Sequence, residues 1–278
     1  MTMKHDSIRS TGDVIHERID YKNWMPKGMV CSALAGTAVF LILFVVFGLS
    51  GLLKPGVLKT VMFIVFLLGT VSGAFVSVWM ILMYRAFSYN GKRQMSRQII
   101  EGTASYVTLP EGGKCLDVGC GSGALAIAVA KRNPKAEITG IDRWGKEYAS
   151  FSRMLCENNA KAEGVSNAVF MSGNAVKLDF ADETFDAVVS NYVYHNIPGD
   201  RQEYLLETLR TLKKGGTFAL HDIFSKSKYG DMQAFVKKLR DMGYAEVRLI
   251  DTTNGMFMSR SESKWMELSG SALLTGRK

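Results

Sequence analysis

The chain has 278 residues, a formal net charge of +8 and 47% hydrophobic residues. The charge is uneven, because residues 1–100 hold 11 Lys and Arg against 4 Asp and Glu, whereas residues 101–278 hold 23 against 22. A nearly neutral C-terminal part argues against nucleic acid as a partner, since such binding needs a basic surface. The four cysteines have no C-x-x-C spacing, so we expect neither a metal site nor a disulfide framework.

Two segments near the N-terminus, 28–53 and 60–84, contain no charged residue. At about 1.5 Å per residue each would run to roughly 38 Å, which exceeds the bilayer's hydrocarbon core of about 30 Å. Neither segment shows a polar face, so two buried core helices of a soluble protein fit poorly. A signal peptide would have a shorter apolar region. We therefore predict two transmembrane helices, at about 29–51 and 60–84, that form a hairpin.

Positive charges predict the orientation of this hairpin. The flank before the first span carries five basic residues: Lys4, Arg9, Arg18, Lys22 and Lys27. The flank after the second span carries four: Arg85, Lys92, Arg93 and Arg97. The loop between the spans carries two, Lys54 and Lys59. The N-terminal segment 1–28 and the domain 85–278 should thus both lie in the cytoplasm. The flanking cations would also meet anionic membrane lipids.

The next informative segment is a strand followed by a glycine-rich loop. Residues 115–118 read as a short buried strand, glycines follow at 119, 121 and 123, and an alanine-rich helix is predicted over 124–132. Glycines let the backbone approach a ligand closely, and the helix start offers free N–H groups. This order of elements is typical of a site for a nucleotide-like ligand.

Asp117 narrows the choice of ligand. The spacing of Gly119, Gly121 and Ala124 also fits a dinucleotide-binding turn, so a nicotinamide-dependent reductase remains an alternative. Asp117, however, stands two residues before the first glycine, where a buried carboxylate needs a cation or strong hydrogen-bond donors. The ammonium group of a ligand would meet this need.

Residues 116–123 resemble the first motif, hDhGxGxG, of the class I S-adenosylmethionine (SAM)-dependent methyltransferases. The likeness continues in order to the C-terminus, with strands expected at 137–141, 168–172, 185–190, 217–223, 245–251 and 271–276 and helices at 94–106, 201–212 and 231–243. It implies an α/β fold, a Rossmann-like seven-stranded sheet flanked by helices, here preceded by the hairpin. It also implies SAM as cofactor and S-adenosylhomocysteine as product.

The resemblance assigns roles to individual residues. Asp117 and the glycine loop would face the methionine portion of SAM, and Asp142 would accept hydrogen bonds from the ribose hydroxyls. Asn174 stands where the family commonly has an acid that accepts from the adenine amino group, and an amide oxygen can also accept. The expected cofactor-binding set is Asp117, Gly119, Cys120, Gly121, Gly123, Asp142, Arg143, Asn174, Ala175 and Asn191.

Two histidines are candidate general bases for an acceptor that must lose a proton. His195 follows the fourth expected strand and His221 lies near the end of the fifth, so both should face the edge where ligands gather in open α/β sheets. Asp222 could orient an imidazole or bind the acceptor, and Tyr192 and Tyr194 could line its pocket. Each histidine and tyrosine could equally be a structural residue.

These expectations combine into a membrane-anchored methyltransferase that acts on a small, lipophilic acceptor. The hairpin suggests such an acceptor because it brings the domain to the bilayer surface. Two alternatives remain, a membrane-tethered SAM-binding scaffold or sensor without turnover and a protein methyltransferase. We further expect the domain to bind SAM without the first 84 residues.

Overall fold

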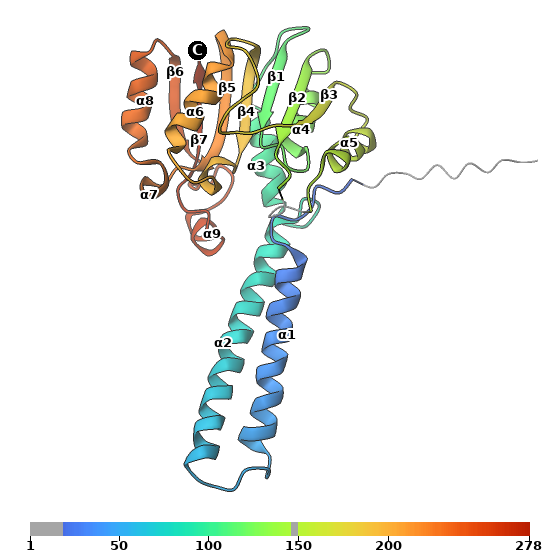
Figure 1. The fold of residues 1–278 in the computed structure, drawn as a ribbon, viewed down its shortest axis with the longest axis vertical. Helices are drawn as coiled ribbons and strands as arrows, with labels where there is room; N and C mark the ends of the chain where they lie inside the picture. The colour runs from blue at the N-terminus through green and yellow to red at the C-terminus, as the bar shows by residue number, and fades with distance from the viewer. Residues whose placement is uncertain (1–18, 146–149) are drawn as a thin grey trace, which may run out of the picture.

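The computed structural model describes residues 19–145 and 150–278. It contains an α/β domain and a helical hairpin that projects from the domain like a rod (Figure 1). The predicted flanking cations Lys4, Arg9 and Arg18 lie outside the described residues.

The hairpin agrees with the two apolar segments. Helix α1 spans Lys27–Leu43 and continues as a π-helical stretch over Phe44–Leu49, and α2 spans Val57–Phe87. The segments Lys27–Leu49 and Val57–Phe87 are long and apolar enough to cross a membrane, with a mean hydropathy of 2.6 and 2.3. Helix α2 ends three residues later than predicted. Its last carbonyls are satisfied by the side chains of Asn23, which donates to Tyr84 O at 2.7 Å, and Ser96, which donates to Phe87 O at 2.8 Å.

Small residues allow α1 and α2 to pack closely. A Cβ atom on Gly69 would lie 2.3 Å from the ring of Phe40, and one on Gly73 would lie 2.8 Å from Thr37 Oγ1. The Thr37 hydroxyl also contacts Ser77 Oγ at 2.9 Å. Close backbone approach and shared hydroxyls are the contacts that hold helices together where the solvent is as apolar as the side chains.

The domain contains a seven-stranded sheet in the order β3-β2-β1-β4-β5-β7-β6, which confirms the expected strand count. Strands β1 to β5 are parallel, and β7 pairs antiparallel with both β5 and β6. The strands are β1 Lys114–Val118, β2 Glu137–Asp142, β3 Ala168–Ser172, β4 Phe185–Asn191, β5 Leu212–Ile223, β6 Ala245–Asp251 and β7 Ser271–Arg277. The carboxyl ends of β1, β2 and β4 therefore meet at one edge, which faces the hairpin (Figure 1).

Helices cover both faces of this sheet, and the strands alternate between two cores. Leu116 and Val188 belong to the core under α6 and α8, whereas Cys115 and Val189 belong to the core under α3, α4 and α5. This alternation is the period of two that strands impose. The helices are α3 Met95–Ala104, α4 Ala124–Arg132, α5 Arg153–Ala162, α6 Arg201–Arg210, α7 Lys226–Tyr229, α8 Met232–Asp241 and α9 Arg260–Trp265.

The fifth strand begins earlier than the sequence predicts. The sequence predicts a helix to 212 and a strand from 217, but α6 stops at Arg210 and β5 begins at Leu212. The pairing of β4 with β5 shifts register between Phe185 and Ala187, and Gly215 has φ +80°. An irregular strand with a left-handed glycine resembles a turn in sequence.

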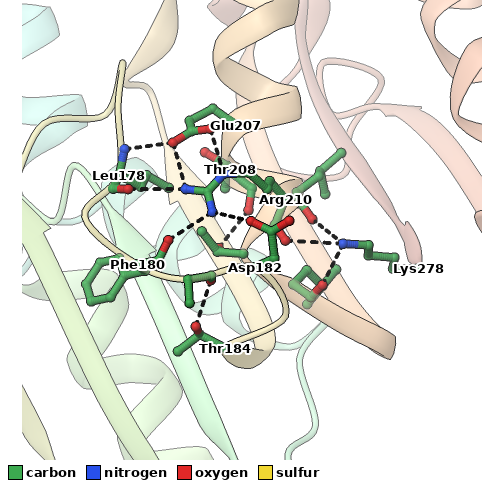
Figure 2. A network of polar contacts seen from close by, with 12 residues as sticks. Leu178, Phe180, Asp182, Thr184, Glu207, Thr208, Arg210 and Lys278 are labelled. Atoms are coloured by element: carbon green, nitrogen blue, oxygen red, sulfur yellow. Dashed lines mark hydrogen bonds and ion pairs between the residues drawn. The ribbon is translucent and has the colours of Figure 1, made fainter.

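The opposite edge of the sheet is held by a network around Arg210 (Figure 2). The Arg210 guanidinium donates to the carbonyls of Phe180 and Leu178 at 2.9 and 3.1 Å and pairs with Glu207 at 2.9 Å. Lys278 Nζ donates to Leu212 O at 2.8 Å. These bonds fix the entry into β4 and the start of β5, so the two strands reach the other edge in a defined register.

The hairpin packing can be tested with two glycines. Gly73→Val should force α1 and α2 apart, because the new side chain meets Thr37, and should destabilise the protein by about 1–3 kcal/mol. Gly36→Val is the matched control, since a Cβ there meets no atom of residues 19–145 or 150–278 within 4 Å. Thermal unfolding of the detergent-purified chain measures both. Equal melting temperatures for the two variants would contradict this packing.

Candidate active site

The glycine loop joins β1 to α4 and is fixed by the end of β2. Gly119, Gly121 and Gly123 have φ of +74°, +56° and +82°, a region that side-chain-bearing residues rarely adopt. The N–H groups of Gly119 and Cys120 donate to Ile141 O at 2.8 and 2.9 Å. Among the described residues, a Cβ on Gly121 would lie within 4 Å of the ring of Phe151 alone, at 3.9 Å.

Asp117 lies beneath the loop with one carboxylate oxygen unsatisfied. The residue is 1% exposed, and its Oδ2 accepts from Ala126 N at the start of α4 at 2.9 Å. No described residue donates to its buried Oδ1. Burial raises the pKa of this carboxyl to about 8, against the opposing effect of the Ala126 hydrogen bond. A cation placed at Oδ1 would satisfy the oxygen and favour the ionised form.

Asp142 stands at the end of β2 and contacts the loop directly. Its Oδ2 accepts from Gly121 N at 2.9 Å and its Oδ1 accepts from Trp144 N at 2.7 Å. The indole of Trp144 donates to Gly121 O at 2.9 Å, so the ring lies against the glycine loop. The structure thus brings Asp117, Asp142 and Trp144 to one loop.

The other expected cofactor residues differ in exposure. Cys120 is buried and burial raises its thiol pKa, which disfavours a reactive thiolate. Asn174 is exposed after β3, and its Oδ1 accepts from Val176 N at 3.0 Å, while Ala175 packs on the core. Arg143 is exposed beside Asp142. Asn174 and Arg143 therefore remain predictions at the outer rim of the site.

The loop after β4 lies directly on the glycine loop. A Cβ on Gly119 would come within 2.3 Å of Val193, and Ser190 Oγ donates to Val118 O at 2.8 Å. The absence of a side chain at Gly119 thus lets the two loops meet. This contact places His195, two residues after Val193, at the same edge as the expected cofactor site.

His195 forms a carboxylate–imidazole pair with Asp222. The distance from His195 Nδ1 to Asp222 Oδ1 is 2.5 Å, and the His195 side chain is 13% exposed. Asp222 also accepts from Tyr194 N at 2.9 Å and Ile223 N at 2.7 Å, which fixes the carboxylate. The pair holds the ring proton on Nδ1 and leaves Nε2 to accept a proton. Asp222 is 1% exposed and contacts His195 Nδ1. Its two predicted roles, orienting an imidazole and binding the acceptor, stay predictions.

His221 is held inside the fold by contacts at both ring nitrogens, and its expected role as a base stays a prediction. It is 1% exposed, and its ring nitrogens contact Asn191 Oδ1 at 2.8 Å and Thr252 Oγ1 at 3.0 Å. Burial lowers its pKa to about 3. The unfolded chain therefore binds a proton at mildly acidic pH that the folded chain does not, so the stability from neutral His221 falls as pH drops from about 6.5 toward 3. Asn191, expected to contact the cofactor, instead supports this ring.

The two tyrosines have different places. Tyr194 is 1% exposed and its hydroxyl contacts Thr208 Oγ1 at 2.5 Å, so it packs in the core, and its expected place in the acceptor pocket stays a prediction. Tyr192 has φ +55° and its ring lies 5.9 Å from the His195 ring and 5.5 Å from the Trp24 ring. A non-glycine residue in this strained conformation beside a candidate base is consistent with an acceptor wall.

Sequence reasoning missed a segment that lies before the hairpin, residues 19–25. Asp20 N donates to Asn159 Oδ1 at 2.8 Å, and Asn159 Nδ2 donates to both Asp20 O and Ser122 O at 3.0 Å. Tyr21 and Met25 are buried, and Trp24 reaches Tyr192. This segment therefore supports the glycine loop, so removing the first 84 residues would also remove part of the site. The expectation that the domain binds SAM without the first 84 residues stays a prediction, and these contacts argue against it.

Residues 109–268 match the family model described as a methyltransferase domain. The chain belongs to this family. The matched residues include β1, the glycine loop, the His195–Asp222 pair and α9.

Two curated relatives of the methyltransferase domain are methyltransferases whose names give different substrates. The chain is 32% identical over 143 residues to a demethylmenaquinone methyltransferase of Bacillus velezensis, which covers 51% of this chain and 59% of the relative. It is 27% identical over 157 residues to the 27-O-demethylrifamycin SV methyltransferase of Amycolatopsis mediterranei, covering 56% of each. The chain thus spans a little over half the length of these relatives.

A solved structure of similar fold is that of the [4+2]-cyclase SpnF. It has a TM-score of 0.52 and 20% sequence identity and covers 69% of this chain and 85% of that one. The likeness confirms the expected Rossmann-like methyltransferase sheet. Because that protein is described as a cyclase, the fold alone does not define the reaction.

The site fits SAM. The glycine loop removes side-chain bulk on the Gly121 side, and the unsatisfied Oδ1 of Asp117 needs a positive partner such as the ligand ammonium. Asp142 stands at the end of the neighbouring strand, where ribose hydroxyls can donate to a carboxylate.

Asp117 should link SAM binding to pH. Its carboxyl holds a proton below about pH 8, so binding the SAM ammonium should release that proton, and affinity should rise by up to about tenfold per pH unit between pH 5.5 and 7. In this range the SAM amino group stays charged, because an α-amino group ordinarily titrates at about pH 7.7–8.0. Calorimetric titration in buffers of different ionisation enthalpy measures the proton release.

Asp117→Asn is the control for this titration. It should bind SAM more weakly and show neither proton release nor the dependence on pH, because the amide cannot ionise. Proton release of the same size in this variant would assign the effect to another group.

Proposed function

We propose that this protein is a membrane-anchored enzyme that transfers the methyl group of SAM to a small lipophilic acceptor. The observation that carries the proposal is the contact of Val193 with Gly119, which joins the expected cofactor loop to the loop of His195. Cofactor and base thus share one edge of the sheet, at the end of the domain that faces the hairpin (Figure 1).

When bound, SAM supplies an electrophilic methyl group, and the protein's residues have to orient the acceptor and remove its proton. Nε2 of His195 is the proton acceptor, because Asp222 holds Nδ1. The same carboxylate stabilises the imidazolium that forms. Tyr192 forms the wall beside it, held by the contact of its hydroxyl with Ser271 Oγ at 2.7 Å. Holding the acceptor close and aligned accounts for much of the barrier, up to roughly 7–11 kcal/mol.

A lipophilic acceptor is favoured by the apolar cluster around Tyr192. Met25, Met83, Phe87 and Met95 are buried there between the hairpin and the domain, and Tyr192 packs against them. Methionine-rich surfaces adapt to ligands of varied shape. The names of the relatives, which act on demethylmenaquinone and on a demethylrifamycin, support the same class of acceptor.

We further propose that α1 and α2 cross the bilayer and that both hairpin ends lie in the cytoplasm, where SAM is made. Among the described residues, the two hairpin helices are almost entirely exposed. In the most apolar stretch of each helix, 0% and 6% of the residues are buried. The contact of Asp20 with Asn159 requires the chain before α1 and the domain after α2 to be on one side. The loop at the far end carries only Lys54 and Lys59.

His195→Gln should lower kcat by about 10²–10⁴-fold with a phenol or quinol that bears an apolar tail, because the acceptor loses its base. The rate of the variant should recover as pH approaches the acceptor's own pKa, about 10 for a phenol. Release of S-adenosylhomocysteine by the detergent-solubilised full chain measures both effects. SAM affinity should not change.

Asn196→Ala is the matched control, since Asn196 is exposed on the same turn. A loss in His195→Gln that does not depend on pH would contradict the role as a base. If the wild-type chain releases no S-adenosylhomocysteine with phenols, quinols, thiols or proteins, it is a SAM-binding scaffold instead.

Membrane topology can be tested by introducing a cysteine into the chain, placing the chain in sealed vesicles and adding a thiol reagent on one side. With Cys31 replaced by Ser, Ser50→Cys should react only with a reagent on the side away from the catalytic domain. Ser88→Cys should react only on the domain side. The pattern follows from the positions of the two residues, because Ser50 follows the last turn of the first hairpin helix and Ser88 follows the last turn of α2, at the other end of the hairpin. Labelling of both from one side would show that the hairpin does not cross.

A further inference from the structure

A cleft of about 490 Å³ lies where the hairpin meets the domain. The last turns of α2, the chain that follows and α9 line it, with Leu82 and Met266 as apolar walls and Arg85, Lys92, Arg93 and Glu262 as charged ones. In Figure 1, α9 hangs from the domain beside the upper end of α2. The proposed active site does not use this cleft.

One of the three cations is already neutralised. Arg93 Nε donates to Glu262 Oε1 at 2.5 Å, and a second guanidinium nitrogen donates to Phe257 O at 2.9 Å. The hydrogen bond from Arg93 holds the pKa of the Glu262 carboxyl at about 2, so Glu262 stays ionised and the pair is complete at neutral pH. The pair forms a rigid wall that joins the segment after α2 to α9.

The other two cations lack such a partner. Arg85 and Lys92 are exposed, and no residue in ranges 19–145 and 150–278 forms an ion pair with either. Glu262 is the acidic residue in the lining, and Arg93 already engages it. Two positive charges therefore face the cleft without compensation, which favours an anionic ligand.

The position of the cleft along α2 indicates which anion it meets. The apolar stretch of α2 starts after Lys59, and about 20 residues at 1.5 Å each cross the 30 Å hydrocarbon core, which brings Trp79 to the boundary. The Trp79 indole donates to Trp265 O on α9 at 2.6 Å, and tryptophans gather at this boundary. Arg85 lies six residues, roughly 9 Å, further on, at the depth of lipid phosphates.

An exposed apolar stripe on α2 leads into the cleft. Phe75, Val78 and Leu82 are 61%, 57% and 51% exposed, and spacings of three and four residues keep them in line with Arg85. An acyl chain along this stripe would bring its headgroup to Arg85. A soluble phosphate would use the cations and leave the stripe unused.

We propose that this cleft binds the phosphate of an anionic phospholipid, of the phosphatidylglycerol class, from the leaflet next to the domain. The proposal rests on the membrane location given under the proposed function. The bound headgroup joins Arg85 of the hairpin to Lys92 of the segment leading into the domain. It thereby fixes the domain, and with it Tyr192 and His195, against the bilayer surface.

Native mass spectrometry of the full chain in detergent, titrated with phosphatidylglycerol, tests the site. The wild-type chain should retain one such lipid in preference to phosphatidylcholine. The double variant Arg85→Gln, Lys92→Gln should lose affinity by about fivefold per charge removed. The matched control, Lys54→Gln with Lys59→Gln, removes two charges at the other end of the hairpin and should retain the lipid.

Three results would overturn the proposal: equal retention of phosphatidylcholine, equal loss in the control variant, or full displacement of the lipid by millimolar inorganic phosphate. The last would indicate a site for free phosphate. SAM affinity, measured on the same samples, should be unchanged in the double variant and shows that it is folded. Turnover of SAM without selective lipid retention would leave the proposed function standing and refute this site alone.

Discussion

The close contact between Gly119 and Val193 is the constraint on which the site depends. The left-handed conformation at Gly119 turns the chain from β1 toward α4, and the missing side chain admits Val193 from the loop after β4. Any larger residue would push the His195 loop away from the cofactor loop. Because Gly119 has no side chain, the cofactor loop and the His195 loop can touch. The parallel pairing of β1 with β4 holds the two loops in register.

The junction between hairpin and domain is a closely packed unit. Residues before α1, the end of α2 and the segment around Phe257 contribute to a single apolar cluster that also touches Tyr192. Phe257 additionally contacts the His221 ring, whose centre lies 5.4 Å away. A shift of the hairpin would therefore move residues that lie within two contacts of the candidate base.

Much of the domain follows from local sequence. The strand over 114–118, the three left-handed glycines and the helix 124–132 were predictable because apolar runs, glycines and alanines each favour one local geometry. The roles of His221 and Tyr194 were not, because their partners Thr252 and Thr208 come from other elements of the chain. The support of the glycine loop by Asp20 and Asn159 joins positions 139 residues apart, and no periodic pattern records such a contact. Burial and pairing of polar side chains are properties of the assembled sheet.

The bond between Asp20 and Asn159 also bears on how the protein is made. Asp20 leaves the ribosome long before Asn159 exists, and in the proposed topology it has to remain on the domain side while both helices insert. The support of the cofactor loop by Asn159 forms only when synthesis has passed α5 and the early segment folds back. Under the proposed topology, a chain whose hairpin inserts the wrong way round would lack this contact with the cofactor loop, so correct insertion and assembly of the proposed site would be coupled.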